Sequence, residues 1–139
     1  MSDLDMQALE EANLALTKEV FNRISNHDAD GICELLHKDA FIEFYGPEII
    51  PYAGKYHGEK CRDFFTNIFS SVEINEFAPE EFICKNDKVV VVGKLHLTSI
   101  KTGRAIKTDF VHVITCKDGK WLVFRDFMNT FVAYQAFSE

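Results

Sequence analysis

Residues 105–130 read AIKTDFVHVITCKDGKWLVFRDFMNT and carry the pattern that decides the fold. Apolar side chains recur at every second position on both sides of Lys117-Asp118-Gly119-Lys120, which is the period of a β-strand. An Asp-Gly pair between two such runs is typical of a β-hairpin. The sequence therefore predicts antiparallel strands over residues 105–116 and 120–130.

The residues before this hairpin predict helices first and strands afterwards. Apolar side chains at helical spacing predict a long helix over residues 4–26, and Asp28 is placed to cap a short second helix. A brief strand over 40–45 and a loop over 46–58 then lead to a third helix. The apolar stripes of the second and third helices are Ile32, Leu35 and Leu36, and Cys61, Phe64, Phe65, Ile68 and Phe69.

From Val72 onward the period changes to two, which predicts further strands over 74–85 and 88–100. Three helices followed by an antiparallel meander predict an α+β domain, with the helices packed on one face of a curved antiparallel sheet. Such a sheet forms a cone with an open mouth, which is a place for a ligand pocket. The length of 139 residues predicts a single domain over 1–139.

Composition and charge exclude several kinds of partner. Twenty-two acidic residues against fifteen Lys and Arg give a net charge of −7, and no basic cluster suits nucleic acid. No apolar run approaches the ~20 residues of a membrane span. The first residues, MSDLDMQALEEANL, lack the basic and then apolar order of a signal peptide, so we expect a cytoplasmic protein.

The four cysteines are widely spaced and include no C-x-x-C pair, which argues against a zinc ribbon or a thioredoxin-type motif. We predict that Cys33, Cys61, Cys84 and Cys116 are small buried hydrophobic residues in a reducing compartment. No set of His, Asp and Glu has the spacing of metal ligands, so we predict neither a metal nor a cofactor.

The turn at Thr102-Gly103 sets which strand positions face each other if it is symmetric. The expected partners are then Leu95 with Phe110, Gly93 with His112, Lys94 with Val111 and His96 with Asp109. This pairing predicts an apolar face that meets the helices and an opposite face that carries Lys94, His96, Lys107 and Asp109.

Two geometries of the final turn remain open, and they place His112 differently. A two-residue Asp118-Gly119 loop would set His112 opposite Arg125 and send Asp126 to the other face. A three-residue loop with Gly119 in a G1 bulge would pair Cys116 with Lys120 and set His112 diagonal to Asp126 on one face. We favour the three-residue loop.

Three motifs resemble the SnoaL-like, ketosteroid-isomerase-related branch of the NTF2-like superfamily. The first is Pro-Tyr-Ala-Gly-Lys-Tyr-His-Gly at residues 51–58, before the third helix. The second is His112 followed seven residues later by Gly-Lys, and the third is Arg-Asp-Phe-Met-Asn-Thr at residues 125–130. The resemblance spans about residues 7–135 and implies the NTF2-like (cystatin-like) cone, a fold shared by isomerases, cyclases, hydratases, epoxide hydrolases and non-enzymes.

The catalytic residues of the comparison families are mostly absent. The tyrosine, base aspartate and protonated aspartic acid of the ketosteroid isomerases fall on Val20, Phe44 and His112. Because a phenylalanine cannot take a proton, steroid isomerisation by that mechanism is not expected. The limonene-epoxide-hydrolase-like enzymes have five catalytic positions, and four of them are replaced in this chain, by Ile42, Phe44, Gly93 and Leu95. Only the aspartate of the last strand is retained, as Asp126.

The candidate catalytic residues are His112 and Asp126. A carboxylate beside an imidazole fixes its tautomer and raises its basicity, which suits proton transfer on an apolar substrate near neutral pH. The structural alternative is a buried pair that only rigidifies the cone, in a non-catalytic binding or dimerisation module. We predict a cofactor-independent isomerase, cyclase or hydratase, with the ligand-binding residues Phe44, Tyr52, Tyr56, His57, Phe110, Phe124 and Met128.

The predicted partners are a small apolar molecule and a second copy of the chain. The resemblance implies a two-fold dimer through the outer face of the sheet, with Trp121, Val123 and Phe127 among the contacts. On the same face, Lys94, His96, Asp109 and Arg125 are expected to form a cross-strand ionic cluster.

Overall fold

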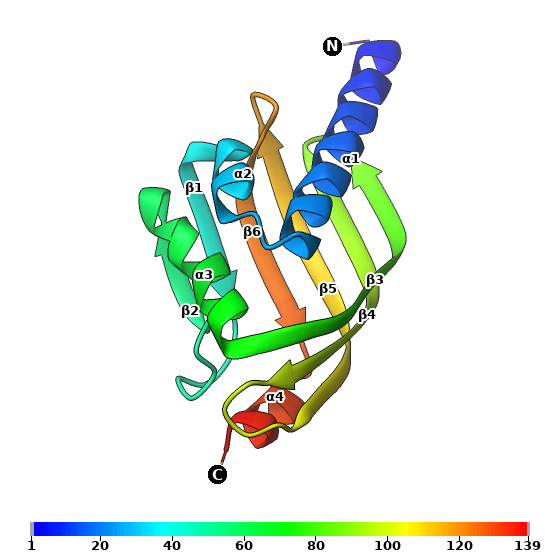
Figure 1. The fold of residues 1–139 in the computed structure, drawn as a ribbon. Coiled ribbons are helices and arrows are strands. Elements are labelled where there is room, and N and C mark those ends of the chain that lie inside the picture. Colours follow the sequence, from blue (N-terminus) through cyan, green and yellow to red (C-terminus); the bar gives the residue numbers. More distant parts are fainter. Residues whose placement is uncertain (1, 139) are drawn as a thin grey trace.

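A six-stranded sheet curves around three helices (Figure 1), in a computed structural model that describes residues 2–138. The single-domain prediction also included Met1 and Glu139, which lie outside the described residues. The strand order in the sheet is β2-β1-β6-β5-β4-β3. The elements are α1 (Asp3–Ser25), α2 (Ala29–Glu34), β1 (Leu36–Phe44), β2 (Gly54–His57), the 3₁₀ turn η1 (Gly58–Lys60), α3 (Cys61–Ser71), β3 (Val72–Lys85), β4 (Lys88–Ser99), β5 (Ala105–Lys117), β6 (Lys120–Met128) and α4 (Thr130–Phe137).

The predicted α+β class is confirmed, but the sheet is mixed rather than antiparallel throughout. Strand β6 returns from the meander and pairs with β1 in parallel, while β2 pairs with the other edge of β1 in antiparallel fashion. The meander itself, β3 to β6, is antiparallel as predicted. The chain passes through β2, α3 and the strands β3, β4 and β5 before it comes back beside β1, and it then runs in the same direction as β1.

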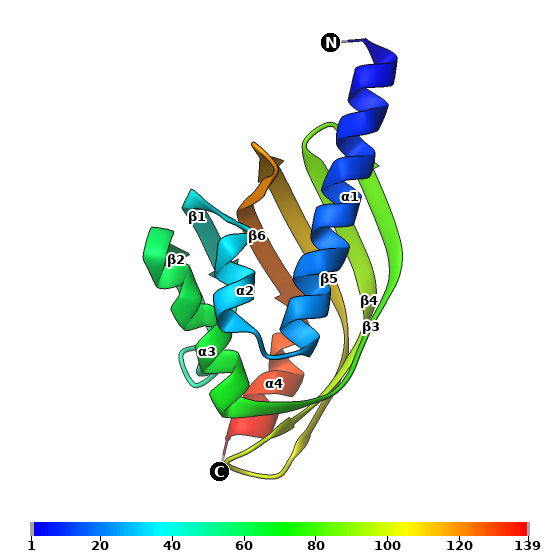
Figure 2. The same ribbon diagram turned by 45° about the horizontal axis from the view of Figure 1, so that its top comes forward.

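The helices α1, α2 and α3 all lie on the concave face of the sheet (Figure 2). Their buried side chains, among them Val20 and Phe21 of α1 and Phe64 and Phe65 of α3, fill the space between helices and sheet. Asp28 caps α2 as predicted, since its side chain accepts a hydrogen bond from Gly31 N. The predicted second helix is too long, because α2 ends at Glu34 and Leu36 already belongs to β1.

The sequence did not predict two of the elements. Strand β2 lies inside the segment predicted as a loop, and helix α4 follows the predicted end of the meander. Helix α4 carries apolar residues on nearly every side, so it shows no helical stripe. Asn129 begins it by accepting hydrogen bonds from the backbone N–H groups of Phe131 and Val132. In Figure 1, α4 lies across the lower end of the cone.

The β4–β5 pairing is shifted by two residues from the prediction. Val91 faces His112, Gly93 faces Phe110 and Lys94 faces Asp109. The loop is centred one residue earlier than a symmetric turn at Thr102-Gly103, because Ser99 N bonds to Arg104 O and the four residues between them are centred on Lys101-Thr102. A shift of two keeps every side chain on its predicted face. The prediction of faces therefore holds, while the predicted partners are wrong.

The β5–β6 hairpin has the two-residue turn, so the favoured three-residue loop is wrong. Lys117 pairs with Lys120, and both Asp118 (φ 54°) and Gly119 (φ 72°) are left-handed, as a type I′ turn requires. A β-bulge follows, since Cys116 pairs with Trp121 but Thr115 pairs with Val123. This bulge adds one residue to β6, and it turns Asp126 to the face of the sheet that carries His112.

The cysteines are free thiols in the part of the chain that the structure describes. Cys61 and Cys116 are buried as predicted, and burial raises the pKa of both thiols to about 11. Cys33 and Cys84 are only half-buried, which differs from the prediction. Among residues 2–138, no helix is long and apolar enough to cross a membrane.

Candidate functional site

His112 and Asp126 face each other directly across strands β5 and β6. His112 Nε2 lies 3.2 Å from Asp126 Oδ1, and the two residues are 4% and 8% exposed. The distance is that of an ion pair, but the direction of the N–H is not that of a formed hydrogen bond, so Asp126 Oδ1 has no hydrogen-bond partner within residues 2–138. Removing both groups from water costs free energy, and an ion pair without a formed hydrogen bond recovers only part of that cost.

Tyr52 completes a group of three buried polar side chains. Its phenol is enclosed by three rings in edge-to-face contact, those of Phe44 (centroids 5.0 Å apart), Phe137 (6.0 Å) and Phe64 (6.4 Å). Burial first, and then the negative charge of Asp126, raise the pKa of Tyr52 well above its ordinary value. The hydroxyl therefore stays protonated and can donate a hydrogen bond.

These three side chains line one cavity of about 60 Å³ inside the cone. The remaining lining residues are all apolar and come from both layers of the fold: Ile24, Phe64, Phe65, Ile68, Ile74, Phe77, Leu95, Leu97, Phe124 and Met128. Sequence reasoning gave Phe64, Phe65 and Ile68 only a core-packing role, because their helical stripe is what any core-facing helix shows.

Unsatisfied hydrogen-bonding groups are concentrated at this cavity. The Tyr52 hydroxyl, His112 Nδ1 and Asp126 Oδ1 are all buried without a hydrogen-bond partner among the described residues. Buried polar atoms are nearly always hydrogen-bonded in native proteins, so three exceptions in one cavity require an explanation. A ligand that brings its own polar group would satisfy them. Among residues 2–138, no group of three or more His, Cys, Asp or Glu is placed to hold a metal ion.

The SnoaL-like domain family matches residues 17–124 of this chain. The chain belongs to the SnoaL-like family. A PhzA/B-like protein of Pseudomonas aeruginosa, itself uncharacterized, is 27% identical over 109 residues, which are 76% of this chain and 76% of that protein.

Solved structures place this SnoaL-like protein in the NTF2-like fold, as predicted. An NTF2-like protein of Burkholderia xenovorans has a TM-score of 0.84 and 24% identity, with 92% of this chain and 97% of that chain covered. The structure of TerC co-crystallized with polyporic acid has a TM-score of 0.79 and 24% identity, with 92% and 99% covered.

Of the predicted ligand-binding residues, only some line the cavity of this SnoaL-like protein. Tyr52, Phe124 and Met128 do. The others lie outside the lining: Phe44 supports the Tyr52 ring, Phe110 packs on His112 with ring centroids 4.3 Å apart, Tyr56 contacts Phe64, and His57 is exposed beside Phe41. Tyr56 is also engaged with its own loop, since its hydroxyl donates to Ala53 O.

Gly93 explains how Phe110 reaches its place beside His112. A Cβ atom at Gly93 would lie 2.4 Å from Ala78 O and 2.8 Å from the Phe110 ring. The missing side chain lets the Phe110 ring lie across β4, where it stacks on Phe77 and packs on His112. Gly93 replaces a catalytic residue of the epoxide-hydrolase set, and in this protein it has a packing role.

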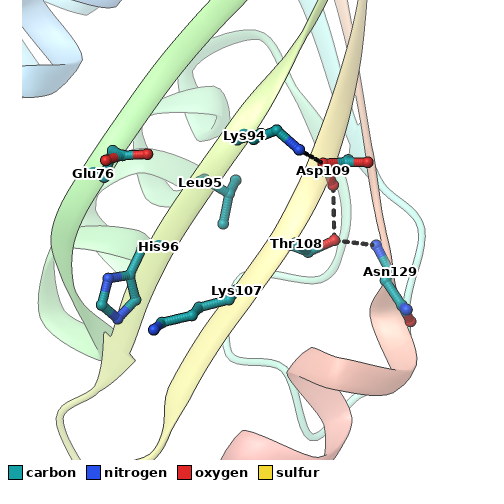
Figure 3. Close-up of a pocket in the computed structure, with 8 residues that line it drawn as sticks. All are labelled: Glu76, Lys94, Leu95, His96, Lys107, Thr108, Asp109 and Asn129. Atoms are coloured by element: carbon teal, nitrogen blue, oxygen red, sulfur yellow. Dashed lines mark hydrogen bonds and ion pairs between the residues drawn. The ribbon is translucent and has the colours of Figure 1, made fainter.

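A larger hollow, of about 670 Å³, lies on the outer face of the sheet (Figure 3). Its charged residues have both signs and lie at the surface, and a half-exposed histidine lies among them: Glu76, Lys94, Lys107, Asp109 and His96. Lys94 Nζ and Asp109 Oδ1 form an ion pair at 3.1 Å, with both side chains more than half exposed. None of the buried unpartnered polar atoms lies here, so the inner cavity is the better candidate site.

The predicted ionic cluster on this face is smaller than expected. Trp121, predicted to contact a second copy of the chain, does not lie on this face. His96 faces Lys107, and Arg125 lies over the stacked rings of Tyr45 and Phe127, beside Glu43 of β1 and away from Lys94 and Asp109. The two-residue turn sets Trp121 opposite the buried Cys116, on the inner face of the sheet. Its ring is 1% exposed, and its indole N–H donates to Thr17 Oγ1. Trp121 therefore belongs to the core and not to an outer interface.

Proposed function

We propose that this SnoaL-like protein binds a small, mainly apolar carbonyl compound in the inner cavity and moves a proton at the carbon beside its carbonyl group. The three unpartnered polar atoms in an otherwise apolar cavity are the observation that supports this proposal. Abstraction of such a proton begins both isomerisation and aldol-type cyclisation. It needs a base and a hydrogen-bond donor and no cofactor.

The two requirements fall on different residues. The His112–Asp126 pair is the base: Nδ1 of His112 has no hydrogen-bond partner among residues 2–138, and Asp126 Oδ1 lies 3.2 Å from the opposite nitrogen. Tyr52 is the donor, because its raised pKa keeps the hydroxyl protonated while negative charge develops on the substrate oxygen. The co-crystal of TerC with polyporic acid is in keeping with a small-molecule ligand for this fold.

Hydrogen–deuterium exchange at carbon tests this proposal without knowledge of the natural substrate. In D₂O, the protein should speed the exchange of the hydrogens beside the carbonyl of cyclohexanone or acetophenone, followed by NMR. Tyr52→Phe removes only the donor oxygen, and we expect it to lower the rate roughly 100-fold, the lower end of what one such donor contributes.

Tyr56→Phe is the matched control. It removes the same atom from a half-buried tyrosine that lies outside the cavity lining. Its exchange rate should equal that of the wild type. Exchange no faster than in buffer, or equal rates for wild type and Tyr52→Phe, would contradict the proposal.

We further propose that the protein forms a two-fold homodimer through the outer face of β4, β5 and β6. A sheet face turned to water normally carries polar side chains, but here the central positions are half-exposed and apolar. They are Val90, Val92, Val111, Val113, Val123 and Phe127. The stacked Tyr45 and Phe127 rings extend this apolar surface toward β1.

Val113→Lys is expected to convert the dimer to a monomer in size-exclusion chromatography with light scattering. Val113 lies in the middle of the apolar surface, between Val90 on β4 and Arg125 on β6. In a self-complementary interface each substitution occurs twice, so two buried lysines must lose water without a partner. Leu4→Lys, at a site 78% exposed on α1, is the control and should leave the mass unchanged. A monomeric wild type would overturn this proposal.

A further inference from the structure

The inner cavity is too small for most ligands in the form that the structure shows. A volume of about 60 Å³ accommodates roughly four water molecules, whereas ligand pockets commonly measure about 300–1,000 Å³. A ligand that reaches Tyr52 and the His112–Asp126 pair must therefore extend beyond this cavity. The rest of the ligand then needs a neighbouring space.

A groove of about 510 Å³ lies at the end of the cone that α4 covers. Its apolar border is made by Ile49 and Pro51 from the loop before β2, Ile100 from the β4–β5 turn, and Phe137 from α4. Ser70 and Ser71 at the end of α3, and Lys101 of the β4–β5 turn, form its polar border. Ile49 and Ile100 are 42% and 54% exposed, which is unusual for isoleucine and adds to the apolar character of the groove. Its volume falls within the range of ordinary ligand pockets.

One pair of rings connects the groove with the cavity. Phe137 borders the groove, Tyr52 lines the cavity, and their ring centroids lie 6.0 Å apart in an edge-to-face contact. Phe137 is 5% exposed, so its side chain fills the space between the two hollows. Rotation of this one side chain would join them.

Hydrogen bonds from the β4–β5 turn fix the end of α4. Arg104 Nη1 donates to the carbonyls of Gln135 (3.1 Å) and Ser138 (2.5 Å), and Thr102 Oγ1 donates to that of Ala136 (2.5 Å). These acceptors flank Phe137 on both sides. The two Arg104 bonds are exposed and the Thr102 bond is partly buried. Bonds to water can replace such bonds, so they contribute little net stability to the closed position of the helix end.

We propose that Phe137 is the gate of the site and that the groove is a second, apolar subsite. This inference rests on the proposed function. The ligand is then an elongated molecule with a carbonyl or hydroxyl group at one end and an apolar tail. Its polar end lies among Tyr52, His112 and Asp126, and its tail passes Phe137 into the groove beside Ile100.

A homologous series of alkyl phenyl ketones, from acetophenone to hexanophenone, tests this subsite. Binding is followed by the fluorescence of Trp121, the one tryptophan of the chain, which stacks on the cavity residue Phe124 at 4.7 Å. If each added methylene enters the groove, affinity should rise roughly three- to fourfold per methylene. Ile100→Asp should abolish this gain, and because Ile100 lies at the surface the variant should fold normally.

Phe137→Ala and Phe131→Ala separate the gate from a general effect on α4. The first should speed association of hexanophenone at least tenfold in stopped-flow measurements. Phe131, 64% exposed on the same helix, should leave the rate unchanged when replaced by alanine.

The outcomes distinguish the two proposals. Affinity that does not change with chain length, together with loss of binding in Tyr52→Phe, would overturn the groove and the gate but keep the proposed function. Failure of every ketone to bind the wild type would overturn both. If Ile100→Asp keeps the chain-length gain, the tail lies elsewhere and the subsite is wrong.

Discussion

The double variant His112→Leu, Asp126→Leu is expected to be at least as stable as the wild type. Buried ion pairs recover little of the free energy lost when both groups leave water, and apolar replacements of similar size are often neutral or stabilising by about 1–4 kcal/mol. The contact between His112 and Asp126 lacks the direction of a hydrogen bond, and both residues are buried. The adjoining cavity of about 60 Å³ has room for the methyl groups of the two leucines. Urea denaturation at constant pH measures the effect.

Each single replacement should behave in the opposite way. His112→Leu or Asp126→Leu alone leaves one buried polar group without its partner, which we expect to lower the free energy of unfolding by about 3–5 kcal/mol. A strongly destabilised double variant would mean that the pair is retained for stability, as the structural alternative holds. A stable but inactive double variant would mean that the pair is retained for chemistry.

Asp126→Asn is expected to lower the rate of deuterium exchange about 10²–10⁴-fold, which is the usual contribution of a positioned base. Asparagine has the shape of aspartate, so the packing beside His112 is kept. The amide carries no negative charge, and it can neither accept a proton nor favour the cationic form of the imidazole. The measurement is the initial exchange rate of acetophenone at saturating concentration.

Asp109→Asn is the matched control for this variant. Asp109 lies on the neighbouring strand, but it is on the outer face, where it pairs with Lys94 at 3.1 Å. The substitution should leave the exchange rate unchanged. Equal rates for Asp126→Asn and Asp109→Asn would remove Asp126 from the proposed reaction, and the site would then be a binding site only.

Local patterns were enough to predict most of the fold. The alternation in residues 105–130 gave the two central strands, and the helical spacing before Val72 gave three helices. These elements follow from periods of two and 3.6 residues, which short stretches of sequence express directly. Helix α4 has no such stripe, so it was not predicted. In the structure, Asn129 caps its first turn.

The side-chain direction of Asp126 shows where local reasoning ends. The Asp118-Gly119 turn is a type I′ turn, and without a bulge it would send Asp126 to the outer face. The bulge after Trp121 reverses this, and it leaves no clear mark in the sequence. The Trp121 ring becomes buried against Phe21 and Phe124 and donates to Thr17, an α1 residue 104 positions away. Trp121 and Phe124 are both buried on the inner face although they lie three positions apart, and an extra residue between them is what allows this.

By itself, the sequence determined the fold class, the strands of the hairpin and the presence of an imidazole and a carboxylate near an apolar surface. Only the tertiary structure decided that these two groups meet, that Tyr52 joins them, and that Tyr56 and His57 do not. Strand and helix periods depend on neighbours within a few residues. The cavity depends on segments as distant as Ile24, Tyr52 and Met128, whose approach is set by packing of the whole core.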